Sequence, residues 1–145
     1  MRNSTLCVVL AALLLYAASA SAHHAFSKTF DPSKQVNLSG TVTKIQWTNP
    51  HVITYVHVKD ANGKVTNWKF EMGNPVSLTK AGWTRDKLNV GQMVTLQGWQ
   101  AKNGSHFASA EEVTMASGER LSAASSYDRG AAVPTSGRTT PTPVE

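Results

Sequence analysis

The chain has 145 residues, a formal net charge of +5 at neutral pH and one cysteine, Cys7. This length fits one small domain, and a lone cysteine excludes an internal disulfide framework. The basic residues are scattered instead of forming runs, so a nucleic-acid-binding patch or a basic tail is not indicated. An apolar core must therefore hold the domain together.

The first residues have the three parts of a secretory signal peptide. Arg2 supplies the positive charge, residues 6–17 are apolar but too few to cross a membrane, and Ala20-Ser21-Ala22 matches an A-x-A cleavage pattern. We therefore expect removal of residues 1–22, together with Cys7, and a periplasmic or secreted chain that begins at His23. A retained anchor is the alternative.

Two long strands are predicted next, because apolar and polar side chains alternate over residues 36–47 and 52–59. The alternation slips by one position at residues 43–44, where a β-bulge would supply the extra residue. Between the strands, residues 48–51 contain Pro50, whose fixed φ predicts a rigid corner.

Three further strands are predicted around two hairpin turns. Residues 60–63 and 102–105 each contain Asn-Gly, which tolerates the positive φ of tight turns. Alternating side chains predict one strand after the first turn, at residues 64–72. Two more strands, at 92–100 and 106–114, flank the second turn.

One helix is expected between the third and fourth strands. Asn74 is a good N-cap, Pro75 suits the first helical position and Gly82 ends the apolar pattern. The order of elements predicts a mainly β fold, a small five-stranded OB-like Greek-key barrel with one helix between strands three and four. A small open β-sandwich or meander with one helix is the alternative.

The predicted organisation has four parts: a signal peptide (1–22), an N-terminal arm (23–34), the OB-like barrel (35–121) and a disordered tail (122–145). Phe26 and Phe30 of the arm are spaced to pack onto the sheet. The tail consists mainly of small and polar residues, which cannot offset the entropy lost on ordering.

Several spaced motifs lie between His23 and Leu121. They are His23-His24-Ala25-Phe26, Gly40-Thr41-Val42, Trp47-Thr48-Asn49-Pro50-His51, Glu71-Met72-Gly73-Asn74-Pro75, Gly82-Trp83 and Gly98 in the fourth strand. Together these motifs resemble a set of small exported bacterial proteins, which is classed as domain-of-unknown-function family sixty-one fifty-two. The resemblance implies an exported, OB-like domain and brings no established activity.

A copper site is the sharpest chemical hypothesis. After cleavage, the α-amine and imidazole of His23 can chelate one Cu(II), and a distal imidazole would complete a histidine brace. His24 adds a neighbouring nitrogen. His51 is the distal ligand in this hypothesis, with His57 and His106 as other candidates. Alternatively, all five are solvated surface residues.

Aromatic side chains form the other candidate site. Barrels of this type bind ligands through aromatic residues on strands two and three, so Tyr55 and Trp68 are candidates for ligand contacts. Trp47 is a further candidate, in a pocket with His51 at the corner between the first two strands. Packing in the core or in the corner is the alternative role of the tryptophans.

The sequence contains no hydrolase, zinc-protease or phosphate-loop motif and no cysteine nucleophile after residue 22. It therefore predicts a non-enzymatic protein that binds copper or, alternatively, an envelope polymer or protein. An oxidative copper enzyme built on the same brace is a further alternative.

Overall fold

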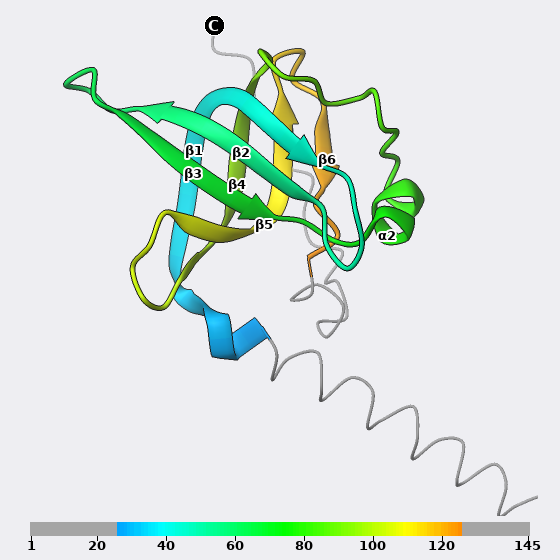
Figure 1. The fold of residues 1–145 in the computed structure, drawn as a ribbon, viewed down its shortest axis with the longest axis horizontal. Helices are drawn as coiled ribbons and strands as arrows, with labels where there is room; N and C mark the ends of the chain where they lie inside the picture. The colour runs from blue at the N-terminus through cyan, green and yellow to red at the C-terminus, as the bar shows by residue number, and fades with distance from the viewer. Residues whose placement is uncertain (1–25, 126–145) are drawn as a thin grey trace, which may run out of the picture.

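The computed structural model of the protein describes residues 26–125 (Figure 1). The predicted signal peptide, His23, His24 and residues 126–145 lie outside this part. A helical turn at residues 26–29 leads into one sheet with a short helix in its third connection. The elements are β1 (Phe30–Gln46), β2 (Ile53–Lys59), β3 (Val65–Glu71), α2 (Pro75–Lys80), β4 (Met93–Ala101), β5 (Phe107–Met115) and β6 (Arg120–Ser122).

The sheet closes into a ring. Its order is β3-β2-β1-β4-β5-β6, and an additional parallel pairing joins β3 to β5. Long β1 bends so that its first part pairs with β4 and its last part pairs with β2 (Figure 1). The predicted mainly β fold is confirmed: five strands form the ring and a helix lies between strands three and four. Short β6 extends the sheet beside β5.

The predicted bulge in β1 is present. The pairing passes from Val42 opposite Val56 to Lys44 opposite Tyr55, so Thr43 is the extra residue. As a result, Val42 and Ile45 both contact the main core although three positions separate them. The bulge thereby decides which β1 side chains reach the outer face of the ring.

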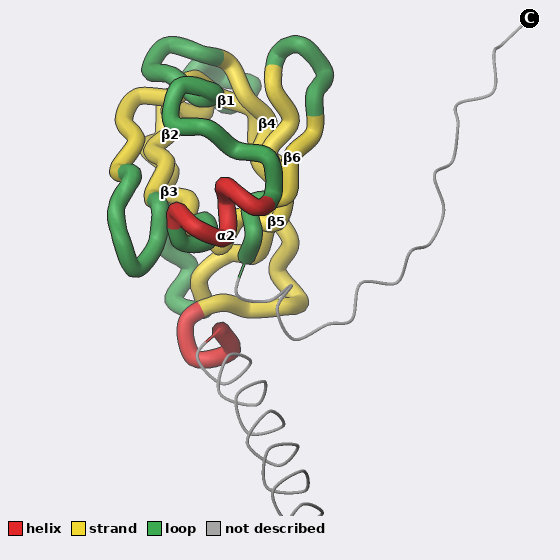
Figure 2. Tube along the Cα trace, turned by 90° about the vertical axis from the view of Figure 1, so that its right-hand side faces the viewer, coloured by secondary structure: helices red, strands yellow, loops and turns green. Residues whose placement is uncertain are grey.

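The main core fills the inside of the ring. Val56, Phe70 and Leu96 are fully buried there, and Leu78 of α2 joins them. Asn74 caps α2 as predicted, because its Oδ1 accepts a hydrogen bond from the Ser77 N–H at 2.8 Å. Figure 2 shows α2 outside the strands, in the connection between β3 and β4. Within residues 26–125, no helix is long and apolar enough to cross a membrane.

A second, aromatic core attaches the arm to the outside of the ring. Phe26 meets Trp99 edge-on at 5.5 Å between ring centroids, and it also contacts Phe30. The carbonyl of Thr29 accepts a hydrogen bond from the Lys102 N–H at 2.9 Å. The predicted packing of Phe26 and Phe30 is confirmed, but β1 begins at Phe30, so the predicted boundary between arm and barrel at residue 35 is wrong.

The domain also continues further than predicted at its other end. Ala123 is buried, and its backbone pairs with Gly73 and Glu111 through two hydrogen bonds of 2.8 Å. The Trp83 indole N–H donates to the Ser122 carbonyl at 2.8 Å. Residues 122–125 therefore belong to the folded domain, not to the predicted disordered tail. Backbone hydrogen bonds and small side chains hold them, and neither leaves an apolar pattern in the sequence.

Candidate functional site

The outer face of the ring carries a row of alternating cationic and aromatic side chains. Lys44 of β1 lies opposite Tyr55 of β2, Tyr55 opposite Lys69 of β3, and Lys69 opposite Phe107 of β5. These four residues, the cation–aromatic row, run across four neighbouring strands. Cross-strand partners on one face of a sheet are close enough to interact, so the row forms one continuous surface.

Two cation–π contacts hold the lysine side chains of the row in place. The Lys69 ammonium lies 3.8 Å from the centroid of the Phe107 ring, and the Lys44 ammonium lies 5.3 Å from that of Tyr55. The Tyr55 hydroxyl donates a hydrogen bond of 2.7 Å to the Gln46 side-chain oxygen. Each ammonium is thus positioned by a ring while it stays able to bind an anion, because no carboxylate of the described residues forms a salt bridge with either lysine.

The end of the row is fixed by the second core. Phe107 contacts Phe30 edge-on at 5.0 Å between ring centroids, and Phe30 is itself buried. The ring that supports Lys69 is therefore held by the start of β1 and by the pairing of β3 with β5. Lys69 and Phe107 are therefore more rigidly positioned than Lys44 and Tyr55.

A histidine–carboxylate pair lies beside the row. Nδ1 of His51 is 3.3 Å from Oε1 of Glu71, and both side chains are half-buried. Glu71 is two positions from Lys69 on β3, so both lie on the same face. Burial raises the pKa of the Glu71 carboxyl above its ordinary value, and the positive charges of His51 and Lys69 pull it back only in part. The pair thus adds a titratable negative charge next to the cations.

The three predicted ligand-binding residues do not come together. Only Tyr55 lies on the row. Trp68 pairs with Val56 and points to the opposite, inner side, where it stacks on Phe70 at 5.9 Å between centroids. Trp47 is half-buried and packs against the main core. Both tryptophans therefore contribute to packing, and Tyr55 is the residue whose surroundings suit a ligand.

The histidines of the described part are also separated from one another. His51 pairs with Glu71, His57 is exposed on β2, and His106 contacts the Trp68 ring at 5.1 Å between centroids. Within residues 26–125, no three His, Cys, Asp or Glu side chains are grouped closely enough to hold a metal ion. His23 and His24, the core of the copper hypothesis, lie outside the described residues.

Lys44, Lys69 and Phe107 are the residues that the sequence did not single out. The alternation along β3 places Lys69 on the outer face. The partner of each residue depends on the register between strands that are far apart in the sequence. Only the bulge at Thr43 hinted that Lys44 would face outward beside Tyr55.

Comparison with known proteins identifies the family of the chain but not an activity. A model described as "Family of unknown function (DUF6152)" matches residues 11–110, which is most of the chain. No curated protein matches the sequence.

Proposed function

We propose that this chain, which belongs to the DUF6152 family of unknown function, is an exported, non-enzymatic protein that binds an acidic glycan of the cell envelope along its cation–aromatic row. The alternative to export is a retained N-terminal anchor. The sequence indicated an envelope polymer as one alternative ligand. We now specify this polymer as an acidic glycan.

This proposal rests on one observation: cationic and aromatic side chains alternate at paired positions of neighbouring strands. Lys44 and Lys69 flank Tyr55 on neighbouring strands. Their backbones are two strand spacings apart, about 10 Å at about 4.8 Å per strand. This separation is comparable to a disaccharide repeat in an extended glycan. A glycan in which acidic and neutral units alternate could place one acidic group at the Lys44 ammonium, which lies over the Tyr55 ring, and another at the Lys69 ammonium, which lies over the Phe107 ring, with a neutral unit beside the edge of Tyr55.

The energetics of the row favour a binding role over a purely structural one. A cation–π contact at an exposed site contributes only about 0.5–1 kcal/mol to stability. The same contact restricts a flexible lysine before the ligand arrives, which lowers the entropic cost of binding. The full chain has a net charge of +5, and removal of Arg2 with the signal peptide would leave 13 basic and 9 acidic residues, or +4, which further favours encounter with an anionic polymer.

Calorimetry with defined oligosaccharides tests the proposal. Hyaluronan hexasaccharide, which alternates acidic and neutral units, is titrated into the protein beside a neutral maltohexaose. We expect binding of the acidic oligosaccharide only, weakened roughly 5- to 160-fold by Tyr55→Ala, since stacking on an aromatic ring contributes about 1–3 kcal/mol.

Val65→Ala is the matched control, because Val65 is an exposed residue of β3 that lies outside the row. It should bind like the parent. Equal binding of both oligosaccharides, or full affinity in a folded Tyr55→Ala variant, would refute the proposal.

Copper binding at a processed N-terminus is a second candidate, and the anchoring of the arm favours it. Phe26 is buried three positions after His23, so the chain between them spans at most about 10 Å. The carbonyl of Thr29 is bonded to Lys102, in the same connection that carries His106. His106 lies in this connection, so we take it as a candidate distal ligand beside His51, which is paired with Glu71.

A Cu(II) titration of protein that begins at His23, followed by EPR, tests this second candidate. We expect one tightly bound equivalent with a nitrogen-rich signal, lost when one residue is added before His23 and altered by His106→Ala. His57→Ala is the control. Binding no stronger than that of a free His-His peptide would eliminate this function.

A further inference from the structure

Two hairpin turns of the barrel contain the same reactive dipeptide, asparagine followed by glycine. Asn62-Gly63 lies between β2 and β3, and Asn103-Gly104 lies between β4 and β5. All four residues are exposed, and both glycines have a positive φ, 83° at Gly63 and 74° at Gly104. The two turns therefore allow the same chemistry to be compared in two different surroundings.

An asparagine followed by glycine can lose its side-chain amide without an enzyme. The backbone nitrogen of the glycine gives up its proton to solvent and attacks the side-chain carbonyl carbon of the asparagine. A C–N bond forms there, the bond to the side-chain nitrogen breaks, and that nitrogen leaves as ammonia after taking a proton from water. Water then opens the cyclic succinimide at either carbonyl, which gives aspartate or isoaspartate. Glycine permits the attack because it has no side chain to hinder it.

The backbone N–H of the glycine is bonded in both turns. Gly63 donates to the Asp60 carbonyl and Gly104 donates to the Ala101 carbonyl, both at 3.0 Å. Each bond must open before the nitrogen can attack, so it slows both reactions alike. The difference between the turns therefore depends on how each asparagine side chain is held.

The turn between β4 and β5 holds its asparagine side chain in place. Oδ1 of Asn103 accepts a hydrogen bond from the Ser105 N–H at 3.0 Å. The Gln100 side chain donates to the carbonyls of Gly104 and Ser105, at 3.2 and 3.0 Å, and fixes the same turn from the end of β4. Attack on the Asn103 side chain therefore requires that a side-chain hydrogen bond break within a doubly fixed turn.

The turn between β2 and β3 is ordered by its aspartate and not by its asparagine. The Asp60 carboxylate accepts the N–H groups of Asn62 and Lys64, at 2.9 and 3.0 Å. The Asn62 side chain forms no hydrogen bond with any other residue of the described part, 26–125. The turn lies at the tip of a hairpin that projects from the barrel (Figure 1). The Asn62 side chain is therefore free to rotate towards the nitrogen of Gly63.

From this contrast we infer that Asn62 is a modification site, which deamidates ahead of Asn103 because its side chain is unbonded. The product adds a negative charge between Lys59 and Lys64. Isoaspartate also adds one atom to the backbone of the turn, which disrupts the two bonds to the Asp60 carboxylate. The cation–aromatic row lies further along the hairpin, so deamidation at Asn62 is independent of ligand binding there.

Peptide mapping by mass spectrometry tests this inference on the full protein, incubated in mildly alkaline buffer at physiological temperature. We expect Asn62 to convert about 2- to 12-fold faster than Asn103, the factor that corresponds to the net contribution of one hydrogen bond. Asn62→Gln should remove the faster conversion and leave the rate at Asn103 unchanged. In protein unfolded by urea, both dipeptides should convert at similar rates.

Gln100→Ala is the matched variant of the other turn. It removes two hydrogen bonds from that turn but keeps Asn103-Gly104, so conversion at Asn103 should accelerate while conversion at Asn62 keeps its rate. Circular dichroism confirms that the variant is folded. Equal rates in the folded parent, faster conversion at Asn103, or a rate difference that persists in urea would overturn the inference.

Discussion

The ammonium of Lys69 lies 3.8 Å from the centroid of the Phe107 ring, across the parallel pairing of β3 with β5. This pairing is the one that closes the sheet into a ring. Phe107 also contacts Phe30, the first residue of β1, which in turn packs against Phe26 of the arm. The best-ordered cation of the candidate binding face is therefore held by the same contacts that close the barrel and attach the arm.

A double-mutant cycle between Lys69 and Phe107 measures that contact. Lys69→Met keeps most of the apolar stem and removes the charge, and Phe107→Leu removes the ring. We expect a coupling free energy of about 0.5–1 kcal/mol in urea unfolding, typical of an exposed cation–π pair. Additive effects of the two substitutions would show that the lysine is not held by the ring.

Gly98→Ala should strongly destabilise the domain. The added methyl group would meet the Ser109 carbonyl oxygen at 1.9 Å, and all three atoms nearest to it belong to the β5 backbone, which has little room to relax. We expect a loss of about 1–3 kcal/mol or more in the free energy of unfolding. Gly104→Asn is the control, because Gly104 has open space around it and Asn tolerates its positive φ of 74°. A loss no larger than that of the control would contradict the close approach of β5 to β4.

Stability should depend on pH through Glu71. Burial raises the pKa of its carboxyl above the ordinary value of 4.5, so the folded state retains the proton to a higher pH than the unfolded state does. The parent protein should therefore lose stability relative to Glu71→Gln as the pH rises from 4.5 through the raised pKa. Unfolding curves of both proteins from acidic to neutral pH measure this difference. A constant difference, or the opposite slope, would contradict the role assigned to burial.

Trp83→Phe should loosen the C-terminal segment of the domain. The indole is 1 % exposed, and its N–H donates to the Ser122 carbonyl. Loss of this donor leaves a carbonyl unpaired and should cost about 1–3 kcal/mol. Hydrogen exchange should become faster at Ala123, whose amide is bonded to Glu111. Unchanged exchange at that amide would show that the indole does not anchor the segment.

Much of the local structure was predictable because it depends on short stretches of sequence. Alternation along β2 and β3 correctly placed Val56 and Phe70 inside the ring. The slip at Thr43 predicted the bulge, and Asn74 with Pro75 predicted the start of α2. Each of these features is fixed by neighbouring residues and by the period of the backbone.

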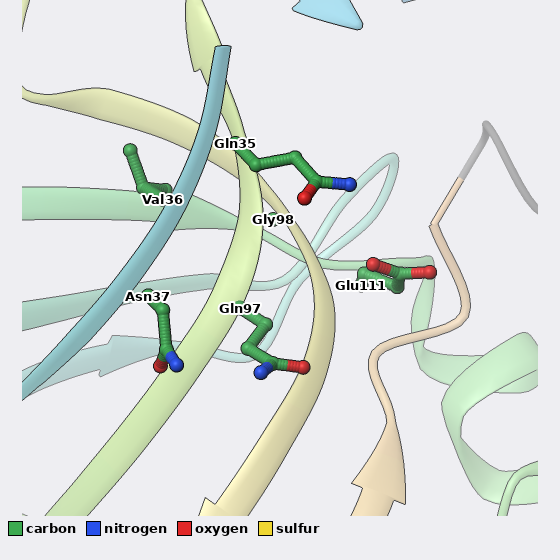
Figure 3. Close-up of a pocket in the computed structure, with 6 residues that line it drawn as sticks. All are labelled: Gln35, Val36, Asn37, Gln97, Gly98 and Glu111. Atoms are coloured by element: carbon green, nitrogen blue, oxygen red, sulfur yellow. The ribbon is translucent and has the colours of Figure 1, made fainter. Parts of the chain in front are cut away.

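The candidate sites were harder to predict because they depend on register between distant strands. Lys69 meets Phe107 only through the pairing that closes the ring, and no local pattern specifies that partner. Trp68 was grouped with Tyr55, although its alternation with Lys69 already placed it on the opposite face. The register shift of β5 against β4, between Gln97 and Gly98 (Figure 3), left no visible slip in the sequence, because the β5 residues at the shift, Ala108, Ser109 and Ala110, are all small. Copper binding by His23, His24 and a distal histidine stays a prediction.

The most direct test of the proposed binding face is a backbone-amide NMR titration of the protein with hyaluronan hexasaccharide. If the row is the site, the largest shifts should cluster at Lys44, Tyr55, Lys69 and Phe107 and should weaken steeply as salt is added, because the contacts are ionic. The shifts should also disappear in Lys44→Gln/Lys69→Gln protein. Absence of binding, or shifts that cluster elsewhere on the barrel and persist in that variant, would contradict the account.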